Sequence, residues 1–481
     1  MTVVERPVAP LLPGELAASL RGRLAAAPST LGSATIPVAA FDPIGLYAAA
    51  AELGLEVALW FRPADDIALV GIGRAWSVGA DGPGRFGAVD AAWRDLIASM
   101  GPIDATDGGA DLPGGVGPVL LGGLGFSGRS PEPGDPWEPF GAASLVLPEL
   151  VAARAGGGHW LTGTTGDPGA PAELVRTWER LGARARDLTP APGGLVARPV
   201  VAPLAIVDER PDAPAWGRAV GLFAGAVGRG RLDKVVLARR VDLASPIELD
   251  VVNALRRLAA SAPESTVFAF RRGDRTFLGA TPERLVRTDG RAFRTVAIAG
   301  STARGADAGE DAVLGAELLA SDKEREEHAV VVASIRERLA PIAERLDIEA
   351  EPRVMVLRHV QHLVTEIEGV LRERESLLAL AERLHPTPAV GGEPRDLALA
   401  LIDEHEGFDR GWYAGPIGWL GADGDGELMV ALRSGLVERT RATLYAGCGI
   451  VADSDADREW EESRMKLRAV ASALGRPGDE P

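Results

Sequence analysis

The stretch REWEESRMK at residues 458–466 contains the charge pattern on which the interpretation of this chain depends. If it is helical, Glu459 and Glu462 lie three residues apart and Lys466 follows four residues later, so the three side chains share one face. Two carboxylates beside an ammonium suit a hard metal ion next to an anion-binding group. Taken alone, a solvated helix face is the commoner explanation for such spacing.

A second charged stretch, KEREEH at residues 323–328, repeats this pattern with Glu324 and Glu327. Between the two stretches lies a series of sequence motifs that an exposed surface would not need. The repeated spacing therefore favours a metal site built from two distant segments over two unrelated solvated faces.

Composition narrows the class of protein. The chain has 481 residues, 46% of them hydrophobic and 25% charged, which is enough for a large core and argues against general disorder. The formal net charge of -17 argues against a nucleic-acid partner, because phosphate contacts need a basic surface. An acidic protein that binds an anion must build a local cationic pocket.

Cellular location is predicted from what the sequence lacks. Cys448 is the single cysteine, so the chain can form no internal disulfide and no cysteine cluster for zinc. We see neither a signal peptide nor a run of roughly 18 apolar residues. We therefore expect a cytoplasmic protein that has no contact with a membrane.

The hydrophobic pattern predicts the α+β class with large, mostly antiparallel sheets, because short strands joined by turns alternate with a few long helices. Loops are expected at 101–117 and 189–194. The expected strands are 56–61, 67–72, 118–121, 234–241, 266–270, 276–279, 415–420, 427–434 and 442–447. The expected helices are 85–100, 216–228, 249–261, 306–343 and 455–474.

The motif GLGFSG at residues 123–128 matches the glycine pattern of dinucleotide-binding proteins. That pattern requires a helix directly afterwards, whose N-terminus meets the pyrophosphate. Here the chain continues as RSPEPGDP at residues 129–136, which cannot form that helix. We therefore interpret the glycines as a structural turn.

Ordered motifs in the second half of the chain carry a family resemblance. They are KVVLAR at 234–239, ATPERL at 280–285, IAGS at 298–301, DKEREEH at 322–328, VQHL at 360–363, LHPTPAVGG at 384–392, YAGPIGW at 413–419, ALRS at 431–434 and AGCGIV at 446–451. In this order they resemble the chorismate-utilising enzymes, a group that includes isochorismate, salicylate, anthranilate and aminodeoxychorismate synthases.

The resemblance implies an architecture as well as an activity. It implies sheets packed as a sandwich with helices on the outside, the fold of anthranilate synthase component I. We expect residues 1–212 to be a variable N-terminal part of the same fold, 213–472 the chorismate-binding catalytic region, and 473–481 a flexible tail. The resemblance is close over the second of these ranges and loose over the first.

Three positions distinguish the members of this group. Lys234 resembles the lysine of the water-using members. No lysine stands in the motif at 386–390, where the aminodeoxychorismate branch carries a nucleophile. Ala389 resembles isochorismate synthases, whereas salicylate and anthranilate synthases tend to have threonine there. The resemblance therefore implies an isochorismate synthase, with a salicylate synthase as the nearer alternative and a non-catalytic chorismate-binding relative as the farther one.

Isomerisation of chorismate to isochorismate adds water at ring carbon C2 and expels hydroxide from C4, so it needs a base and an acid. Lys234 is the candidate base, and it must be held neutral by burial or by a nearby cation. Glu283 is the candidate acid, and burial must keep it protonated.

The resemblance also implies a magnesium ion and the residues that bind the substrate. Glu327 and Glu462 would be direct Mg²⁺ ligands, with Glu324 and Glu459 nearby or acting through water; carboxylate oxygens are the ligands that Mg²⁺ prefers. The residues expected to hold the ring and its second carboxylate are Gly300, Ser301, His362, Ala389, Tyr413, Arg433, Gly447, Gly449 and Lys466. We expect a monomer whose product feeds menaquinone or catechol siderophore biosynthesis.

Overall fold

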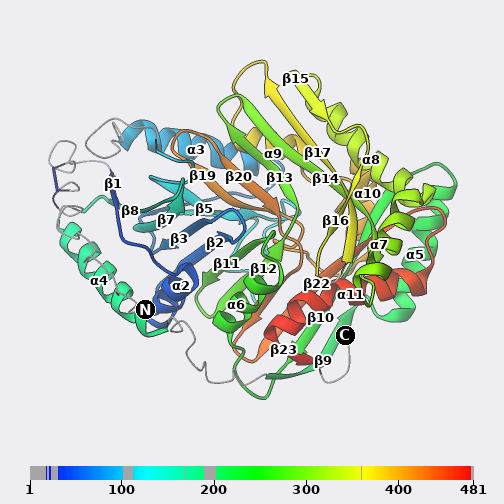
Figure 1. The fold of residues 1–481 in the computed structure, drawn as a ribbon, viewed down its shortest axis with the longest axis horizontal. Helices are drawn as coiled ribbons and strands as arrows, with labels where there is room; N and C mark the ends of the chain where they lie inside the picture. The colour runs from blue at the N-terminus through cyan, green and yellow to red at the C-terminus, as the bar shows by residue number, and fades with distance from the viewer. Residues whose placement is uncertain are drawn as a thin grey trace, which may run out of the picture.

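The computed structural model describes residues 18, 21, 22, 31–100, 112–167, 169–188, 202–358 and 360–477. Within these residues two large sheets lie face to face, and helices cover their outer sides (Figure 1). Every strand pair is antiparallel except that of the last strand, β23, with β9. The predicted α+β class with mostly antiparallel sheets is confirmed.

The first sheet has 13 strands in the described part of the chain, and β18 pairs with β10 beside the main path. In spatial order they are β1 (Gly32–Pro37), β8 (Gly158–Thr165), β7 (Leu150–Ala155), β3 (Ile67–Ile72), β2 (Val57–Arg62), β11 (Thr266–Arg272), β12 (Arg275–Thr281), β21 (Ser434–Glu438), β22 (Arg441–Ile450), β10 (Lys234–Ala244), β9 (Ala202–Arg210) and β23 (Gly475–Pro477), with β18 (Gly392–Glu393).

The second sheet has 10 strands among the residues described, and β16 pairs with β17 beside its main path. In spatial order they are β15 (Ala343–Ile348), β17 (Val360–Leu371), β14 (Ala292–Ala303), β13 (Arg284–Asp289), β20 (Gly426–Val430), β19 (Pro416–Gly421), β5 (Val119–Leu124), β6 (Ala143–Leu147) and β4 (Trp76–Gly79), with β16 (Arg353–Val356).

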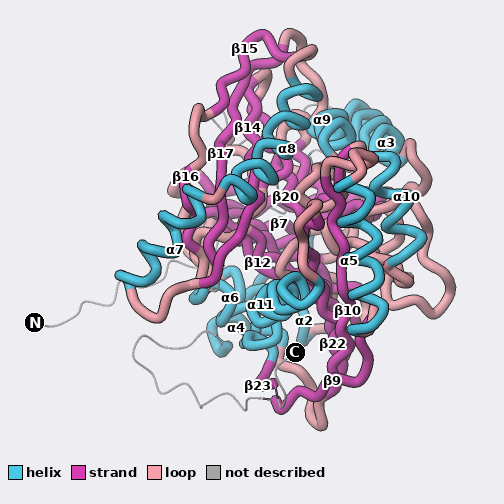
Figure 2. The backbone as a smooth tube through the Cα atoms, turned by 90° about the vertical axis from the view of Figure 1, so that its right-hand side faces the viewer, coloured by secondary structure: helices cyan, strands magenta, loops and turns pink. Residues whose placement is uncertain are grey.

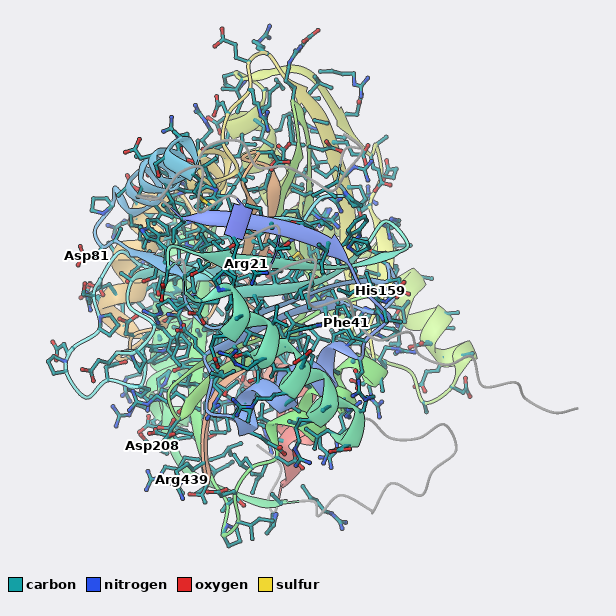
Figure 3. The ribbon with its side chains drawn as sticks, turned by 90° about the vertical axis from the view of Figure 1, so that its left-hand side faces the viewer. Arg21, Phe41, Asp81, His159, Asp208 and Arg439 are labelled. Carbon is teal, nitrogen blue, oxygen red and sulfur yellow. The ribbon has the colours of Figure 1, made fainter. Side chains whose placement is uncertain are left out.

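The helices are α2 (Pro43–Glu52), α3 (Arg85–Met100), α4 (Pro171–Leu188), α5 (Ala213–Gly228), α6 (Val251–Ser261), α7 (Ala308–Ala320), α8 (Asp322–Leu339), α9 (Leu377–Leu384), α10 (Arg395–His405) and α11 (Ala456–Leu474). Figure 2 shows α5, α10 and α11 on the side of the molecule that faces the viewer. Figure 3 shows the opposite side with α4, where the rings of Phe41 and His159 meet edge to face at 5.5 Å.

Alternation along the strands of the first sheet builds two cores. In β11, Phe268 and Phe270 face the core between the sheets, whereas Val267 and Ala269 face a second core under the helices. Successive side chains of a strand point to opposite faces, so a continuous apolar run predicts a strand buried on both sides. The sheet is therefore covered on both faces.

The two halves of the chain share the core between the sheets. Phe140 from the N-terminal half packs edge to face against Trp412 at 5.2 Å and lies 6.4 Å from Phe277. Strand pairing also crosses residue 212, because β2 pairs with β11 and β5 pairs with β19.

Most of the elements expected from the sequence are present, with three corrections. The single helix predicted at 306–343 is wrong, because Ser321 ends α7 and its hydroxyl caps the N-terminus of α8 by accepting from the amide of Glu324. The single strand predicted at 427–434 is also wrong. It divides into β20 and β21 at Arg433, whose φ of 48° interrupts extended backbone.

The third correction concerns the flexible tail predicted at 473–481. Ala473 and Leu474 complete α11, and Gly475–Pro477 forms β23, so these residues are ordered by helix contacts and by pairing with β9. The rest of that tail, the loop predicted at 189–194 and residues 101–111 of the other predicted loop lie outside the described residues.

Candidate active site

A cavity of about 840 Å³, including the solvent at its mouth, lies where β10, β14 and β22 meet α8 and α11. In Figure 1, α8 and α11 lie on the same side of the molecule although more than a hundred residues separate them. Every site residue named from the sequence lines this cavity: Lys234, Glu283, Gly300, Ser301, Glu324, Glu327, His362, Ala389, Tyr413, Arg433, Gly447, Gly449, Glu459, Glu462 and Lys466. The two glutamate stretches therefore face one space.

Lys234 begins β10, and its side chain is buried with 1% of its surface exposed. Its Nζ lies 2.7 Å from Oε1 of Glu327 on α8. A Cβ at Gly449, on the neighbouring strand β22, would lie 2.5 Å from Cε of Lys234 and 2.7 Å from the same carboxylate oxygen. Glycine at this position thus leaves the space in which the buried ion pair forms.

Glu283 lies in the turn between β12 and β13 and is 5% exposed. Burial raises the pKa of its carboxyl to about 7, although the positive charges of Lys234, Arg433 and Lys466 act in the opposite direction. Desolvation disfavours the ionised form of a carboxyl more strongly here than those cations favour it. Both forms of Glu283 are therefore populated near neutral pH, as an acid that donates a proton requires.

The glutamates of α11 form a compact acidic cluster. Carboxylate oxygens of Glu459 and Glu462 and the sulfur of Cys448 all lie within 4.8 Å of one another. Burial and then the charge of Glu462 raise the pKa of Glu459 to about 7. Cys448 donates to the backbone oxygen of Glu459 at 3.2 Å, and burial raises the pKa of its thiol well above the usual value. The oxygen atoms are thus the better ligands for a hard cation.

The glutamates of α8 differ in their partners. Burial acts to raise the pKa of Glu327, but the charge and hydrogen bond of Lys234 together with the charges of Lys466 and Lys323 outweigh it, so the pKa is lowered. The pKa of Glu324 is raised by burial and by the charge of Glu327, and its Oε2 accepts from the amide of Ser301 at 2.9 Å. Of the four glutamates, Glu327 and Glu462 each form an ion pair with a lysine. Glu324 and Glu459 form none among the described residues.

Lys466 lies one helical turn after Glu462 on α11. Its Nζ is 2.5 Å from Oε1 of Glu462 and donates to the backbone oxygen of Gly447 at 3.0 Å. Burial acts to lower the pKa of Lys466, but the charge and hydrogen bond of Glu462 together with Cys448 outweigh it, so the pKa is raised. The cavity therefore contains a fixed positive charge beside β22.

The backbone of β22 presents amides to the cavity at Gly447 and Gly449. Opposite them in β10 lie Ala238 and Val236, whose amides bind Glu406 and Gly391 rather than β22. In an antiparallel ladder, two opposite residues that do not bond to each other both direct their amides and carbonyls away from the partner strand. Gly447 and Gly449 therefore direct theirs away from β10. β21 pairs with β22 only as far as Leu444, so among the described residues no strand pairs with Gly447 and Gly449 on the side away from β10, and both glycines line the cavity.

His362 on β17 links Ser301 to Arg433. Nη2 of Arg433 lies 3.0 Å from Nε2 of His362, and Nδ1 lies 2.9 Å from the hydroxyl of Ser301. A guanidinium only donates, so Nε2 must accept and the ring proton sits on Nδ1. Burial and then the charge of Arg433 lower the pKa of His362 well below its usual value, which keeps the ring neutral.

Two buried residues that the sequence analysis did not name hold the glutamate helices in place. Arg239 on β10 donates to the hydroxyl of Ser463 on α11 at 2.6 Å and lies 3.1 Å above the ring of Trp460. His328 on α8 has Nε2 2.7 Å from the hydroxyl of Thr365 on β17. Arg239 belongs to the KVVLAR motif and His328 to DKEREEH, so membership of these motifs was the available signal.

Lys323 and Arg410 also line the cavity and were not expected there. Lys323 begins the second glutamate stretch and was interpreted only as part of its charge pattern. Arg410 lies three residues before Tyr413, at the end of a run that also contains Glu404, Glu406 and Asp409, so its charge was not a distinctive signal in the sequence.

Comparison with known proteins agrees with this geometry. Residues 19–475 match the family described as chorismate binding enzyme, and the chain belongs to this family. The match begins far before residue 213, so the family likeness extends through the N-terminal half, which the motifs alone had matched only loosely.

The individual relatives are isochorismate synthases by name. The chain is 37% identical over 457 residues to the salicylate biosynthesis isochorismate synthase of Pseudomonas aeruginosa, covering 93% of this chain and 91% of that one. It is 38% identical over 363 residues to isochorismate synthase MenF of Bacillus subtilis, covering 75% of each. The structure of MenF, the menaquinone-specific isochorismate synthase from Escherichia coli, is similar with a TM-score of 0.74 and 28% identity, covering 95% of this chain and 99% of that one.

The glycine that faces the Lys234–Glu327 pair offers a direct test of the site. We expect Gly449→Ala to displace the lysine and to reduce chorismate turnover on the order of tenfold or more, since small misplacements of reacting groups are costly. Steady-state kinetics on purified protein measures the effect. Gly221→Ala in α5, where an added Cβ meets nothing within 4 Å, is the matched control and should leave turnover unchanged. Wild-type turnover in Gly449→Ala would contradict the assigned geometry.

Proposed function

We propose that this protein is an isochorismate synthase that converts chorismate to isochorismate with Mg²⁺. The observation that carries the proposal is the pairing of a buried amine, Lys234, with a buried carboxyl of raised pKa, Glu283, in one cavity. A protein that only binds chorismate has no need of such a matched base and acid. Similarity to named isochorismate synthases along most of the chain supports the same reaction.

In the proposed reaction, the Lys234 ammonium that pairs with Glu327 first loses a proton to solvent. The neutral amine then takes a proton from water as the water oxygen bonds to C2 of the ring. The double bonds shift, and the bond from C4 to its hydroxyl oxygen breaks. Glu283 gives its proton to that departing oxygen, so one water is consumed and one is released. A proton must then return from Lys234 to Glu283 through solvent before the next turnover.

Binding of the substrate uses the positive charges and donors of the cavity. Arg433 presents a planar fork that suits a carboxylate, while Lys466 and the amides of Gly447 and Gly449 supply further donors. Tyr413 also lines the cavity. Neutral His362 with its proton on Nδ1 holds Arg433 and Ser301 in position and adds no charge.

The acidic cluster fits a magnesium ion. Glu459 and Glu324 have raised pKa values because they are buried beside other carboxylates, an arrangement that a divalent cation relieves. We propose that Glu327 and Glu462 bind Mg²⁺ directly and that Glu324 and Glu459 lie nearby or act through water. When bound, the ion would neutralise the ring carboxylate of chorismate and withdraw electron density from the ring.

The setting of the reaction is part of the same proposal. We propose that the product enters menaquinone or catechol siderophore biosynthesis in the cytoplasm and that the protein works as a monomer. A single cysteine fits a reducing compartment. No helix in the residues described is long and apolar enough to cross a membrane.

Product identification tests the proposed function. Purified protein incubated with chorismate and Mg²⁺ should yield isochorismate, EDTA should stop the reaction, and added Mg²⁺ should restore it. Lys234→Ala should reduce turnover by roughly 10²- to 10⁴-fold, the usual contribution of a general base. Chromatography with mass and fluorescence detection identifies the product. Salicylate formed without an added lyase, or unchanged chorismate, would overturn the proposal.

The pH dependence of turnover tests the role of Glu283. Its acid form is present below its pKa of about 7 and is lost as pH rises, so kcat/KM should fall on the alkaline side with a midpoint near 7. Glu283→Gln should lose this descending limb and most of the activity. Asp274→Asn, at an exposed hairpin turn, should retain both. A limb that persists unchanged in Glu283→Gln would reject this acid.

The metal assignment is tested on α8. Because Glu327→Gln removes a proposed ligand, we expect the Mg²⁺ concentration for half-maximal activity to rise at least about tenfold, in the range seen for altered metal surroundings. Glu326→Gln changes the exposed neighbouring residue and should leave that concentration unaltered. Titrating Mg²⁺ against activity and, separately, against the melting temperature provides the measurement. Wild-type Mg²⁺ dependence in Glu327→Gln would refute this ligand.

A further inference from the structure

Strand β10 has a gap in its pairing close to Lys234. On the side away from β22, β18 pairs only with Lys234 and Val235 of β10. The pairing of β10 with β9 begins only at Arg240. Residues 236–239 therefore have no strand beside them on that side within the described part of the chain. Buried backbone amides and carbonyls must find other partners, because leaving them unpaired costs free energy.

A buried ion pair takes the place of the missing strand. Oε1 of Glu406 accepts from the amide of Ala238 at 2.7 Å, and Nη2 of Arg410 donates to the backbone oxygen of Val236 at 2.8 Å. The amide of Val236 donates to the oxygen of Gly391 at 2.8 Å. On this side, β10 is thus held two to four residues after the candidate base by two side chains and the backbone oxygen of Gly391 and not by a strand, whereas its other side pairs with β22.

Arg410 binds two further walls of the cavity. Its Nη1 donates to the backbone oxygen of Val390 at 2.8 Å, next to Ala389 in the cavity lining. Its own backbone oxygen accepts from the amide of Tyr413 at 2.9 Å. Its guanidinium also lies 4.2 Å from the centre of the Phe126 ring. One residue therefore connects the strand of Lys234, the loop of Ala389 and the turn of Tyr413.

The geometry of this pair depends on the shape of arginine. Arg410 and Glu406 are each 3% exposed, and Nε of Arg410 lies 2.7 Å from Oε2 of Glu406. A guanidinium holds its donors in one plane and can bind a carboxylate and two carbonyls at once, whereas an ammonium cannot reproduce that fork. Because these donors are engaged by protein groups, Arg410 acts on the cavity through its neighbours.

We propose that Arg410, held by Glu406, is a positioning residue that sets the distances between the Lys234 amine, the wall at Ala389 and Tyr413. This role rests on the proposed function. It predicts that loosening the pair while keeping both charges slows the chemical step more than it weakens binding of substrate and metal. The hydrogen bonds of the pair go to Val236, Ala238 and Val390 and to none of the cations or glutamates assigned to the substrate carboxylates and the metal.

The test compares Arg410→Lys and Glu406→Asp with Arg62→Lys. All three keep their charges and change a buried Arg–Glu pair; Arg62 binds Glu427 at 2.8 Å, and neither residue lines the cavity. We expect kcat to fall roughly 10- to 100-fold in the first two variants, as for misplaced reacting groups, with KM and half-saturating Mg²⁺ within about threefold of wild type. Arg62→Lys should lower the melting temperature without lowering kcat.

The possible outcomes separate this role from the proposed function. If the wild-type protein converts chorismate, and Arg410→Lys and Glu406→Asp both have the same kcat as Arg62→Lys, the positioning role alone is overturned. A rise in KM at constant kcat, or a failure of both variants to fold while Arg62→Lys folds, would also overturn it, because either result would assign the pair to binding or to stability. A wild-type protein that leaves chorismate unconverted would overturn the proposed function, and this role with it.

Discussion

The contact between Lys234 and Glu327 determines how the rest of the cavity is arranged. The amine comes from the first sheet and the carboxylate from α8, which lies in the chain between β14 and β15 of the second sheet, so the pair forms only when both sheets are in place. Neither charge can be buried alone without a large desolvation cost. Gly449 supplies the space for the pair, and the Glu406–Arg410 pair fixes the strand that carries the lysine.

Charge in the cavity is only partly matched by the protein itself. Lys234 and Lys466 each meet one carboxylate, while Glu459 and Glu324 keep raised pKa values beside other acids. A dianionic substrate entering this space would add to the negative charge. The proposed Mg²⁺ would offset it, which is why the metal and the substrate carboxylate are assigned to the same side of the cavity. Glu327 serves both the proposed metal and the lysine, so the two functions of the site are linked through one side chain.

The residues of the site were predictable from the sequence to the extent that local patterns determine them. Helical spacing placed Glu459, Glu462 and Lys466 on one face, and the order of motifs identified Lys234 and Glu283. Long-range properties were not predictable in this way. The approach of α8 to α11 depends on how two sheets pack together, and no local periodicity records it.

The misses have identifiable physical causes. Helical periodicity continues through Ser321, so only its hydroxyl cap reveals that two helices meet there. Glu406 and Arg410 are four residues apart, a spacing typical of exposed ion pairs, and burial of the pair follows from a gap in strand pairing that the sequence does not specify. The strand predicted at 427–434 is interrupted by the backbone conformation of Arg433, which its side chain does not indicate.

Several residues of the site lie where regular structure is interrupted. Glu283 stands where the chain passes from β12 in the first sheet to β13 in the second, and Arg433 stands where it returns from β20 to β21. Gly300, with φ of 79°, lies at the point in β14 where pairing with β17 shifts register. A regular strand would direct alternate side chains into the two cores, whereas these crossings and the bulge turn them into the space between sheets and helices. The rigid sheets on either side then hold those side chains at fixed distances, which is the requirement for placing an acid and a base on one substrate.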